Sequence, residues 1–180
     1  MLQIVIPETE YFNEVDETFH TIKAQTLQLE HSLLSLAKWE SKWCKPFLSK
    51  ENKTYEETLD YIKCMTINQN VDPLAYKAIT KKQIDEINDY IAAPMTATTF
   101  SKEQGGGRSG EIVTNELIYF WMINANIPSE YQKWHLNRLL TLIRVCNVKN
   151  QPPKKMSKKA LMNRNRELNA ARRQQLGTSG

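Results

Sequence analysis

The chain has 180 residues, of which 41% are hydrophobic and 24% are charged. A chain of this length is expected to form one domain with its own core, so that no disulfide is needed for stability. The longest apolar run, residues 117–123, is far shorter than the roughly 20 residues that a membrane-spanning helix requires, which argues against a membrane protein.

The cysteines and the N-terminus favour a reducing cytosol. Cys44, Cys64 and Cys146 are an odd set with no close pair, as is typical of free thiols. No signal peptide is visible, because the apolar residues 2–6 form a short run without a basic start.

The net charge of +4 is unevenly distributed along the chain. Residues 149–180 hold nine cations and one anion, a net +8, which leaves −4 for residues 1–148. An acidic body with a basic tail suggests that the tail either folds back on the body or serves an acidic partner.

The first thirty residues predict a small β-hairpin. Residues 2–6 (LQIVI) are rich in β-branched side chains and are followed by Pro7, so they indicate a strand. Residues 8–18 are acidic and are expected to be irregular, and residues 19–29 are expected to be the second extended piece. Two strands alone are marginally stable in water, so this hairpin must pack on helices.

Local capping signals then predict several helices. Ser32 is expected to cap a helix that ends before Pro46. Capping boxes at residues 54–57 and 80–83 open two further helices, and a short helix is expected after Asp72.

Residues 101–110 predict a linker between residues 1–100 and 111–150. Residues 105–107 are three adjacent glycines, which cost much entropy to order. A phosphate-binding loop is the alternative, but the segment lacks the GK[ST] ending and follows no clear strand.

Residues 111–150 predict the core of the protein, a helical hairpin. The first helix is expected to begin after Ser109 as its N-cap, with Glu111 in its first turn, and to be buried because apolar side chains cover most of its surface. The second helix follows Pro128 and is amphipathic, with one face formed by Leu136, Leu139, Leu140, Leu142, Ile143 and Cys146.

Aromatic side chains outside this leucine face are candidate partner contacts. Tyr131, Trp134 and Val145 lie off the face and Arg138 lies at its flank, so they either cover another segment of the chain or bind a partner. Trp39 and Trp43 are second candidates, since their four-residue spacing fits core packing or a peptide-binding pocket.

Residues 151–180 predict a basic tail. Residues 151–156 contain two prolines and are expected to be extended, and Ser157 is expected to cap a last helix. Either the tail is a solvated or protein-docking helix, or it binds nucleic acid without sequence specificity, because it has no aromatic side chain for stacking. Its basic residues are Lys154, Lys155, Lys158, Lys159, Arg164, Arg166, Arg172 and Arg173.

The sequence predicts no catalytic residue, metal ligand or cofactor. His20, His31, His135 and the cysteines show none of the spacings of a metal site, so His135 is expected to be a hydrogen-bonded core residue. The cysteines lie in apolar helical patterns, where thiols are inert. We therefore expect a mainly α protein: a compact helical domain with a small N-terminal β-hairpin, a central helical hairpin and a basic C-terminal helix.

Four runs of sequence, taken together, resemble a known group of proteins. They are residues 27–33 (LQLEHSL) with 39–43 (WESKW), residues 95–100 (MTATTF), residues 134–147 (WHLNRLLTLIRVCN) with 152–156 (PPKKM), and residues 166–173 (RELNAARR) with the LGT ending. They resemble tail assembly chaperones, small proteins encoded in the tail-gene region of long-tailed bacteriophages (siphoviruses).

The resemblance implies a helical, non-enzymatic protein in the host cytoplasm during phage assembly. Such chaperones bind the long helical tape measure protein until tail tube subunits polymerise around it, and self-association is possible. The strongly basic tail departs from this pattern. Two alternatives therefore stay open: a structural virion protein of the head–tail region, and a nucleic-acid-binding protein that uses residues 151–180.

Overall fold

The computed structural model describes residues 1–13, 17–100, 112–150 and 157–177. They form two compact units, Met1–Lys149 and Asn150–Gly180, and the fold is mainly α, as predicted. The proposed linker at residues 101–110 and the extended segment at residues 151–156 lie outside the described residues.

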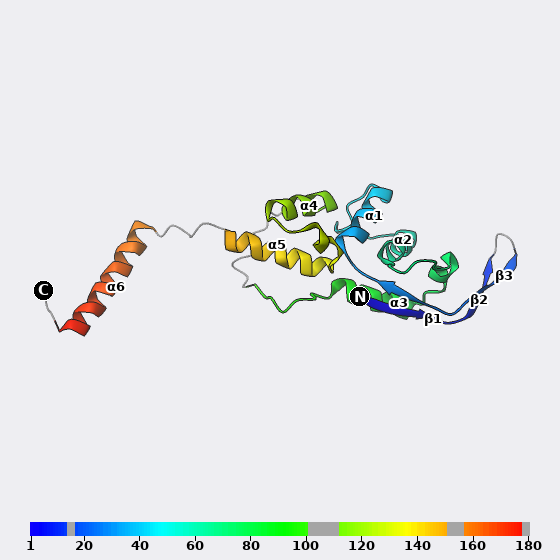
Figure 1. Ribbon diagram of the computed structural model, residues 1–180, viewed down its shortest axis with the longest axis horizontal. Helices are drawn as coiled ribbons and strands as arrows, with labels where there is room; N and C mark the ends of the chain where they lie inside the picture. Colours follow the sequence, from blue (N-terminus) through cyan, green and yellow to red (C-terminus); the bar gives the residue numbers. More distant parts are fainter. Residues whose placement is uncertain (14–16, 101–111, 151–156, 178–180) are drawn as a thin grey trace. The chain divides into compact units, whose positions relative to one another are not determined.

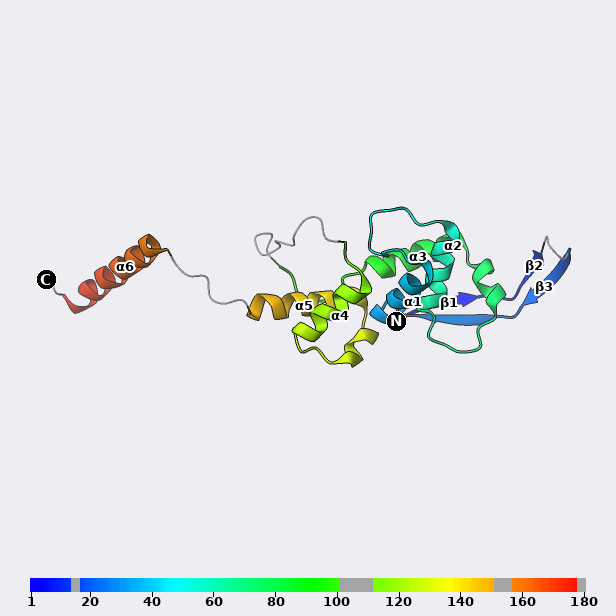
Figure 2. The ribbon, with the colours of Figure 1, turned by 90° about the horizontal axis from the view of Figure 1, so that it is seen from above.

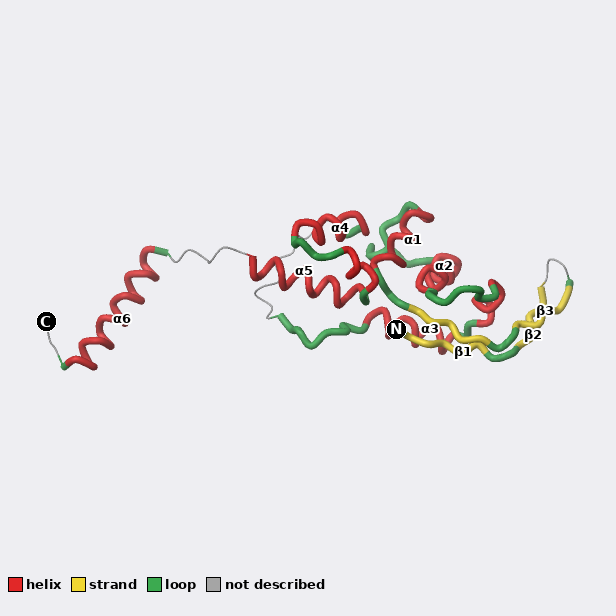
Figure 3. Tube along the Cα trace, in the orientation of Figure 1, coloured by secondary structure: helices red, strands yellow, loops and turns green. Residues whose placement is uncertain are grey.

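Two antiparallel strand pairs follow one another along the N-terminal ribbon (Figures 1 and 3). They are β1 (Leu2–Ile6) with β4 (Gln25–Leu29), and β2 (Thr9–Asn13) with β3 (Thr18–Ile22). The expectation of irregular structure over residues 8–18 is wrong for Thr9–Asn13. Phe12 lies opposite Phe19 with ring centroids 5.0 Å apart, and such cross-strand aromatic pairs stabilise a ribbon.

Alternation along β1 and β4 buries one face of the ribbon. Ile4 and Ile6 on β1, with Leu27 and Leu29 on β4, are at most 2% exposed. The outer edge of β4 is also occupied, because the Ile67 N–H donates to the Gln28 carbonyl at 2.8 Å.

Helical segments follow this ribbon in the chain: α1 (Leu33–Trp43), α2 (Tyr55–Met65), the 3-10 helix η1 (Pro73–Ala78) and α3 (Lys81–Ala92). Of these, α2, η1 and α3 lie beside the ribbon, and α1 packs on α2 (Figures 1 and 2). Both capping boxes are confirmed: Thr54 with Glu57 and Thr80 with Gln83 satisfy each other's backbone amides. Ser32 caps as predicted, and Asp72 caps the short helix before Pro73.

The C-terminal half is also helical in its described part. It contains α4 (Asn115–Asn124), the 3-10 helix η3 (Ser129–Lys133), α5 (Leu136–Asn150) and, in the second unit, α6 (Lys158–Leu176). The predicted start directly after Ser109 is wrong, since α4 begins at Asn115 and residues 112–114 are not helical. Ser109, the expected N-cap, lies outside the described residues.

The carboxylate of Glu40 on α1 supplies the cap that begins α4. Glu40 is 6% exposed, and its Oε2 accepts hydrogen bonds from both the backbone N–H and the side-chain amide of Asn115, each at 2.7 Å. Its Oε1 accepts from the Phe47 N–H at 2.7 Å. A negative charge at a helix N-terminus is favourable, so Glu40 fixes α4 against α1.

One hydrophobic core extends through the first unit. Buried side chains of the ribbon and of α1–α3 form a single cluster with Ile118 and Met122 of α4 and with Leu136, Leu139 and Ile143 of α5. The expected boundary between residues 1–100 and 111–150 therefore does not separate two cores.

The expectation that the first helix of the hairpin is buried all round is wrong. Ile118 and Met122 are buried, but Phe120 is 55% exposed and Ile123 is 72% exposed. They lie on the side of α4 away from Ile118, because the core covers only one side of the helix.

We predict that Glu40→Ala lowers the free energy of unfolding by about 3 to 5 kcal/mol, because three buried N–H donors lose their acceptor. Urea denaturation followed by circular dichroism measures this change. The control Glu86→Ala, at an exposed site on α3, should stay within about 0.5 kcal/mol of the parent. Equal stabilities for the two variants would contradict the capping role.

Candidate functional site

Two buried histidines meet where β4 leads into α1 and where α5 begins. The ring centroids of His31 and His135 are 5.1 Å apart. The Leu136 N–H donates to the His31 carbonyl at 2.7 Å, and Ser32 forms an antiparallel bridge with His135. This junction joins α5 to the N-terminal half.

Hydrogen bonds fix both imidazoles. His31 Nδ1 lies 2.5 Å from the Tyr61 hydroxyl, and His135 Nε2 donates to the Tyr90 carbonyl at 3.1 Å. His135 Nδ1 has no hydrogen-bond partner among the described residues. The expectation that His135 is a hydrogen-bonded core residue is confirmed.

Burial keeps both histidines neutral at neutral pH. Desolvation lowers the pKa of His31 to about 3, with a smaller contribution from His135. Burial also lowers the pKa of His135. Within the described part of the chain, no three His, Cys, Asp or Glu side chains are grouped so that they could hold a metal ion.

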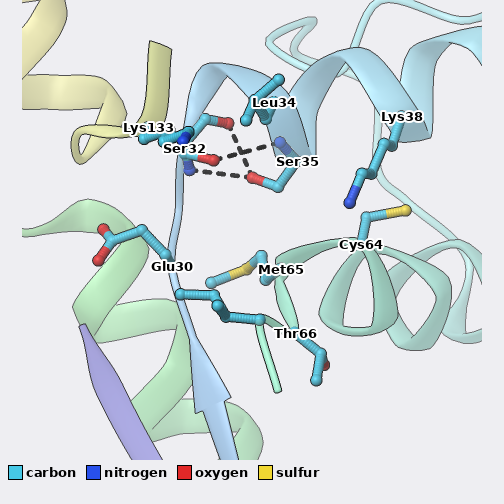
Figure 4. A pocket seen from close by; sticks show the side chains of 10 residues that line it. Glu30, Ser32, Leu34, Ser35, Lys38, Cys64, Met65, Thr66 and Lys133 are labelled. Carbon is cyan, nitrogen blue, oxygen red and sulfur yellow. Dashed lines mark hydrogen bonds between the residues drawn. The ribbon is translucent and has the colours of Figure 1, made fainter. Parts of the chain in front are cut away.

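A pocket of about 320 Å³ opens at the start of α1 (Figure 4). Lys38 and Lys133 contribute positive charge to its wall, and Glu30 contributes a carboxylate. Its serine hydroxyls are engaged in capping: Ser35 Oγ accepts from the Ser32 N–H at 2.9 Å, and Ser32 Oγ accepts from the Ser35 N–H at 3.3 Å.

Cys64 in this pocket is a poor nucleophile. Burial is the largest cause that raises the pKa of its thiol, and the nearby Asp60 raises it further. A raised pKa leaves little thiolate at neutral pH, and the thiolate is the reactive form.

A larger groove of about 690 Å³ lies beside α4. We name it the α4 groove. It is formed by the segment after α1, the segment before α4, and single side chains of α4 and α5, and its lining residues are Leu48, Ser49, Lys50, Glu51, Ile112, Val113, Trp121 and Leu140. Its volume is within the range of ligand-binding clefts, and its apolar side chains fit an apolar ligand surface.

The predicted contacts Tyr131, Trp134 and Arg138 come together in one stack. The rings of Tyr131 and Trp134 are 4.2 Å apart and nearly parallel, at 19°. The guanidinium of Arg138 lies 3.9 Å from the Trp134 ring centroid, within the range of a cation–π interaction. Both rings are half-buried and Arg138 is exposed, so the stack presents part of its surface to solvent.

The remaining predicted contacts are scattered. Val145 is half-buried on α5. Trp39 is 1% exposed and its indole N–H donates to the Glu57 carbonyl at 2.9 Å, so it has almost no surface for a partner. Trp43 stacks on Trp39 and donates to Asp60 Oδ2 at 3.0 Å, which fits the core-packing alternative for both indoles.

The described basic residues of the tail lie on α6, and each of them is exposed. They are Lys158, Lys159, Arg164, Arg166, Arg172 and Arg173. Lys154 and Lys155 lie outside the described residues.

Ile112, Phe120 and Ile123 were not predicted to be surface residues, but each is more than half exposed. A helix that is apolar on nearly every side gives no indication of which side faces the core. The α4 groove was also missed, because its lining comes from segments far apart in the sequence.

No protein-family model, curated protein or solved structure matches this chain. Among the described helices, none is both long and apolar enough to cross a lipid bilayer.

We predict that stability falls between pH 7 and pH 5 because of His31. The folded pKa of about 3 lies below the ordinary 6.5, so the unfolded chain binds the proton first as the pH falls. The contribution is complete above pH 6.5 and is lost progressively towards pH 3. The expected loss from pH 7 to pH 5 is about 2 kcal/mol, measured by urea denaturation at each pH.

The control is His31→Gln, which removes the titrating group. Whatever its absolute stability, this variant should show a flatter pH dependence over the same interval. An unchanged slope in His31→Gln would show that other groups cause the effect.

Proposed function

We propose that this protein is a non-enzymatic assembly chaperone that binds an apolar, helical segment of a client protein at α4. The observation that carries the proposal is the exposed apolar side of α4, a helix that also lines the α4 groove through Trp121. In line with the resemblance to phage tail assembly chaperones, we propose the tape measure protein as the client, bound in the host cytoplasm before the tail tube forms.

The α4 groove suits the client's apolar stripe. An amphipathic helix presents apolar residues at positions i, i+3, i+4 and i+7, and binds in grooves with apolar walls. Trp121 and Leu140 supply such surface inside the groove, while Lys50 and Glu51 supply polar groups.

Phe120 and Ile123 form a second exposed apolar surface on the same helix, rotated from Trp121 by about 100° and about 160°. Both are more than half exposed, and exposed apolar side chains that lie together often mark a binding site. Burial of their exposed fractions against a client would contribute roughly 1 to 2 kcal/mol each.

The stack of Tyr131, Trp134 and Arg138 is a second contact in this proposal. Tryptophan, tyrosine and arginine dominate the binding energy of many interfaces. The stack is already ordered in the free protein, so its side chains would lose little conformational entropy when a client binds.

The test is co-expression of the full chain with the tape measure protein from the same tail-gene region, with the soluble fraction of the tape measure protein as the readout. We predict that Phe120→Ser/Ile123→Ser weakens client binding by about 2 kcal/mol, roughly 30-fold in Kd, and lowers that soluble fraction. Thermal stability should change little, since both side chains are exposed.

Val5→Ser/Met162→Ser is the matched control, because Val5 is 62% exposed on β1 and Met162 is 71% exposed on α6, both outside the proposed surface. It should leave the client as soluble as the parent chain does. If the parent chain keeps no client soluble, the proposal fails. Abundant copies in purified virions, detected by mass spectrometry, would instead favour a structural virion protein.

A further inference from the structure

The second unit presents a strongly basic helix that the proposed client site does not use. Within α6, every side chain that the structure describes is exposed. The helix contains six cations and one acidic residue, Glu167, so its net charge is +5.

The cations include a regular row along the helix. Lys159, Arg166 and Arg173 are spaced seven residues apart, so successive members are separated by roughly 10.5 Å and rotate by only about 20°. Asn169 lies three residues after Arg166 and four before Arg173, which places it on the same side.

The apolar residues Leu161 and Leu168 form a separate row. Each follows a member of the basic row by two residues, a rotation of about 200°, so the leucines lie on the opposite side of α6. The basic row therefore lies opposite the leucines, whereas Arg164 and Arg172 flank the leucine row and Lys158 lies between the two sides.

From this arrangement we infer that α6 binds double-stranded DNA, with Lys159, Arg166 and Arg173 facing the duplex. A helix of 19 residues is about 28 Å long, and the major groove of B-DNA admits an α-helix. Arginine binds phosphate oxygens in a bidentate manner, and asparagine pairs with phosphates or base edges.

The chemistry of α6 favours duplex DNA over single strands and double-stranded RNA. The helix has no aromatic residue, so it lacks the stacking surface that single-strand binders use. The major groove of duplex RNA is too deep and narrow for side chains to read. Binding is dominated by phosphate contacts, with a dissociation constant on the order of 10⁻⁴ to 10⁻⁶ M at physiological salt.

The test is fluorescence anisotropy of a short labelled duplex of random sequence, titrated with the full chain over a series of salt concentrations. The row variant is Lys159→Gln/Arg166→Gln/Arg173→Gln. Its matched control, Lys158→Gln/Arg164→Gln/Arg172→Gln, removes the same charge from the same helix at other positions. Glutamine keeps a high helix propensity, and circular dichroism verifies the helix content of each variant.

The row variant should reduce the slope of log K against log salt by about 2 to 3, because each phosphate contact contributes about 0.9. The control should reduce it by less than half as much. Equal losses in the two variants would overturn the assignment of the row, and no salt-dependent binding by the full chain would overturn the inference entirely.

Two further arms separate the other partners. A single strand of the same length should bind more weakly than the duplex. Polyglutamate of equal charge should not displace the duplex. Stronger binding to the single strand than to the duplex would overturn the inference that α6 binds duplex DNA. Stronger binding to polyglutamate would also overturn it, in favour of docking to an acidic protein.

Discussion

The buried carboxylate of Glu40 is the interaction on which the arrangement of the first unit depends. A carboxylate taken out of water needs hydrogen-bond donors, and here all three come from backbone or side-chain amides of Phe47 and Asn115. Because one of them is the first amide of α4, the same contact that satisfies the charge also fixes where α4 begins and how it meets α1.

That position explains the exposed surface. With its start held at Glu40, α4 directs Ile118 and Met122 into the core and leaves Phe120 and Ile123 in solvent. The hydrogen bond from the Leu136 N–H to the His31 carbonyl fixes the start of α5 next to the start of α1. Trp121 and Leu140 in the α4 groove are therefore held on helices with fixed ends, while the other lining residues belong to the segments after α1 and before α4.

The helices of the N-terminal half could be predicted from sequence because their signals are local. Ser32, Thr54 and Thr80 each cap a helix through a partner three residues away. The Glu40 cap could not be predicted, because 75 residues separate it from Asn115. β2 was missed because its stability comes from its pairing with β3 and not from its own acidic sequence.

The candidate site was predicted only in part. Tyr131 and Trp134 were predicted as contacts because they lie off the leucine face, and Arg138 because it lies at the flank of that face. The fold brings these three side chains into contact. Trp39 and Trp43 were predicted as second candidate contacts. The burial of Trp39 depends on its contacts with α2 and Phe47, and the spacing of the two indoles does not reveal these contacts. The apolar pattern of α4 likewise did not indicate which side of the helix faces the core.

The most direct measurement of the central claim is site-specific photo-crosslinking during tail assembly. A photoreactive phenylalanine analogue replaces Ile123 on α4 in one chain and Phe19 on β3 in another, and mass spectrometry identifies the adducts. The account predicts an adduct between position 123 and the tape measure protein, and none from position 19. Adducts with that protein from position 19 alone would contradict it.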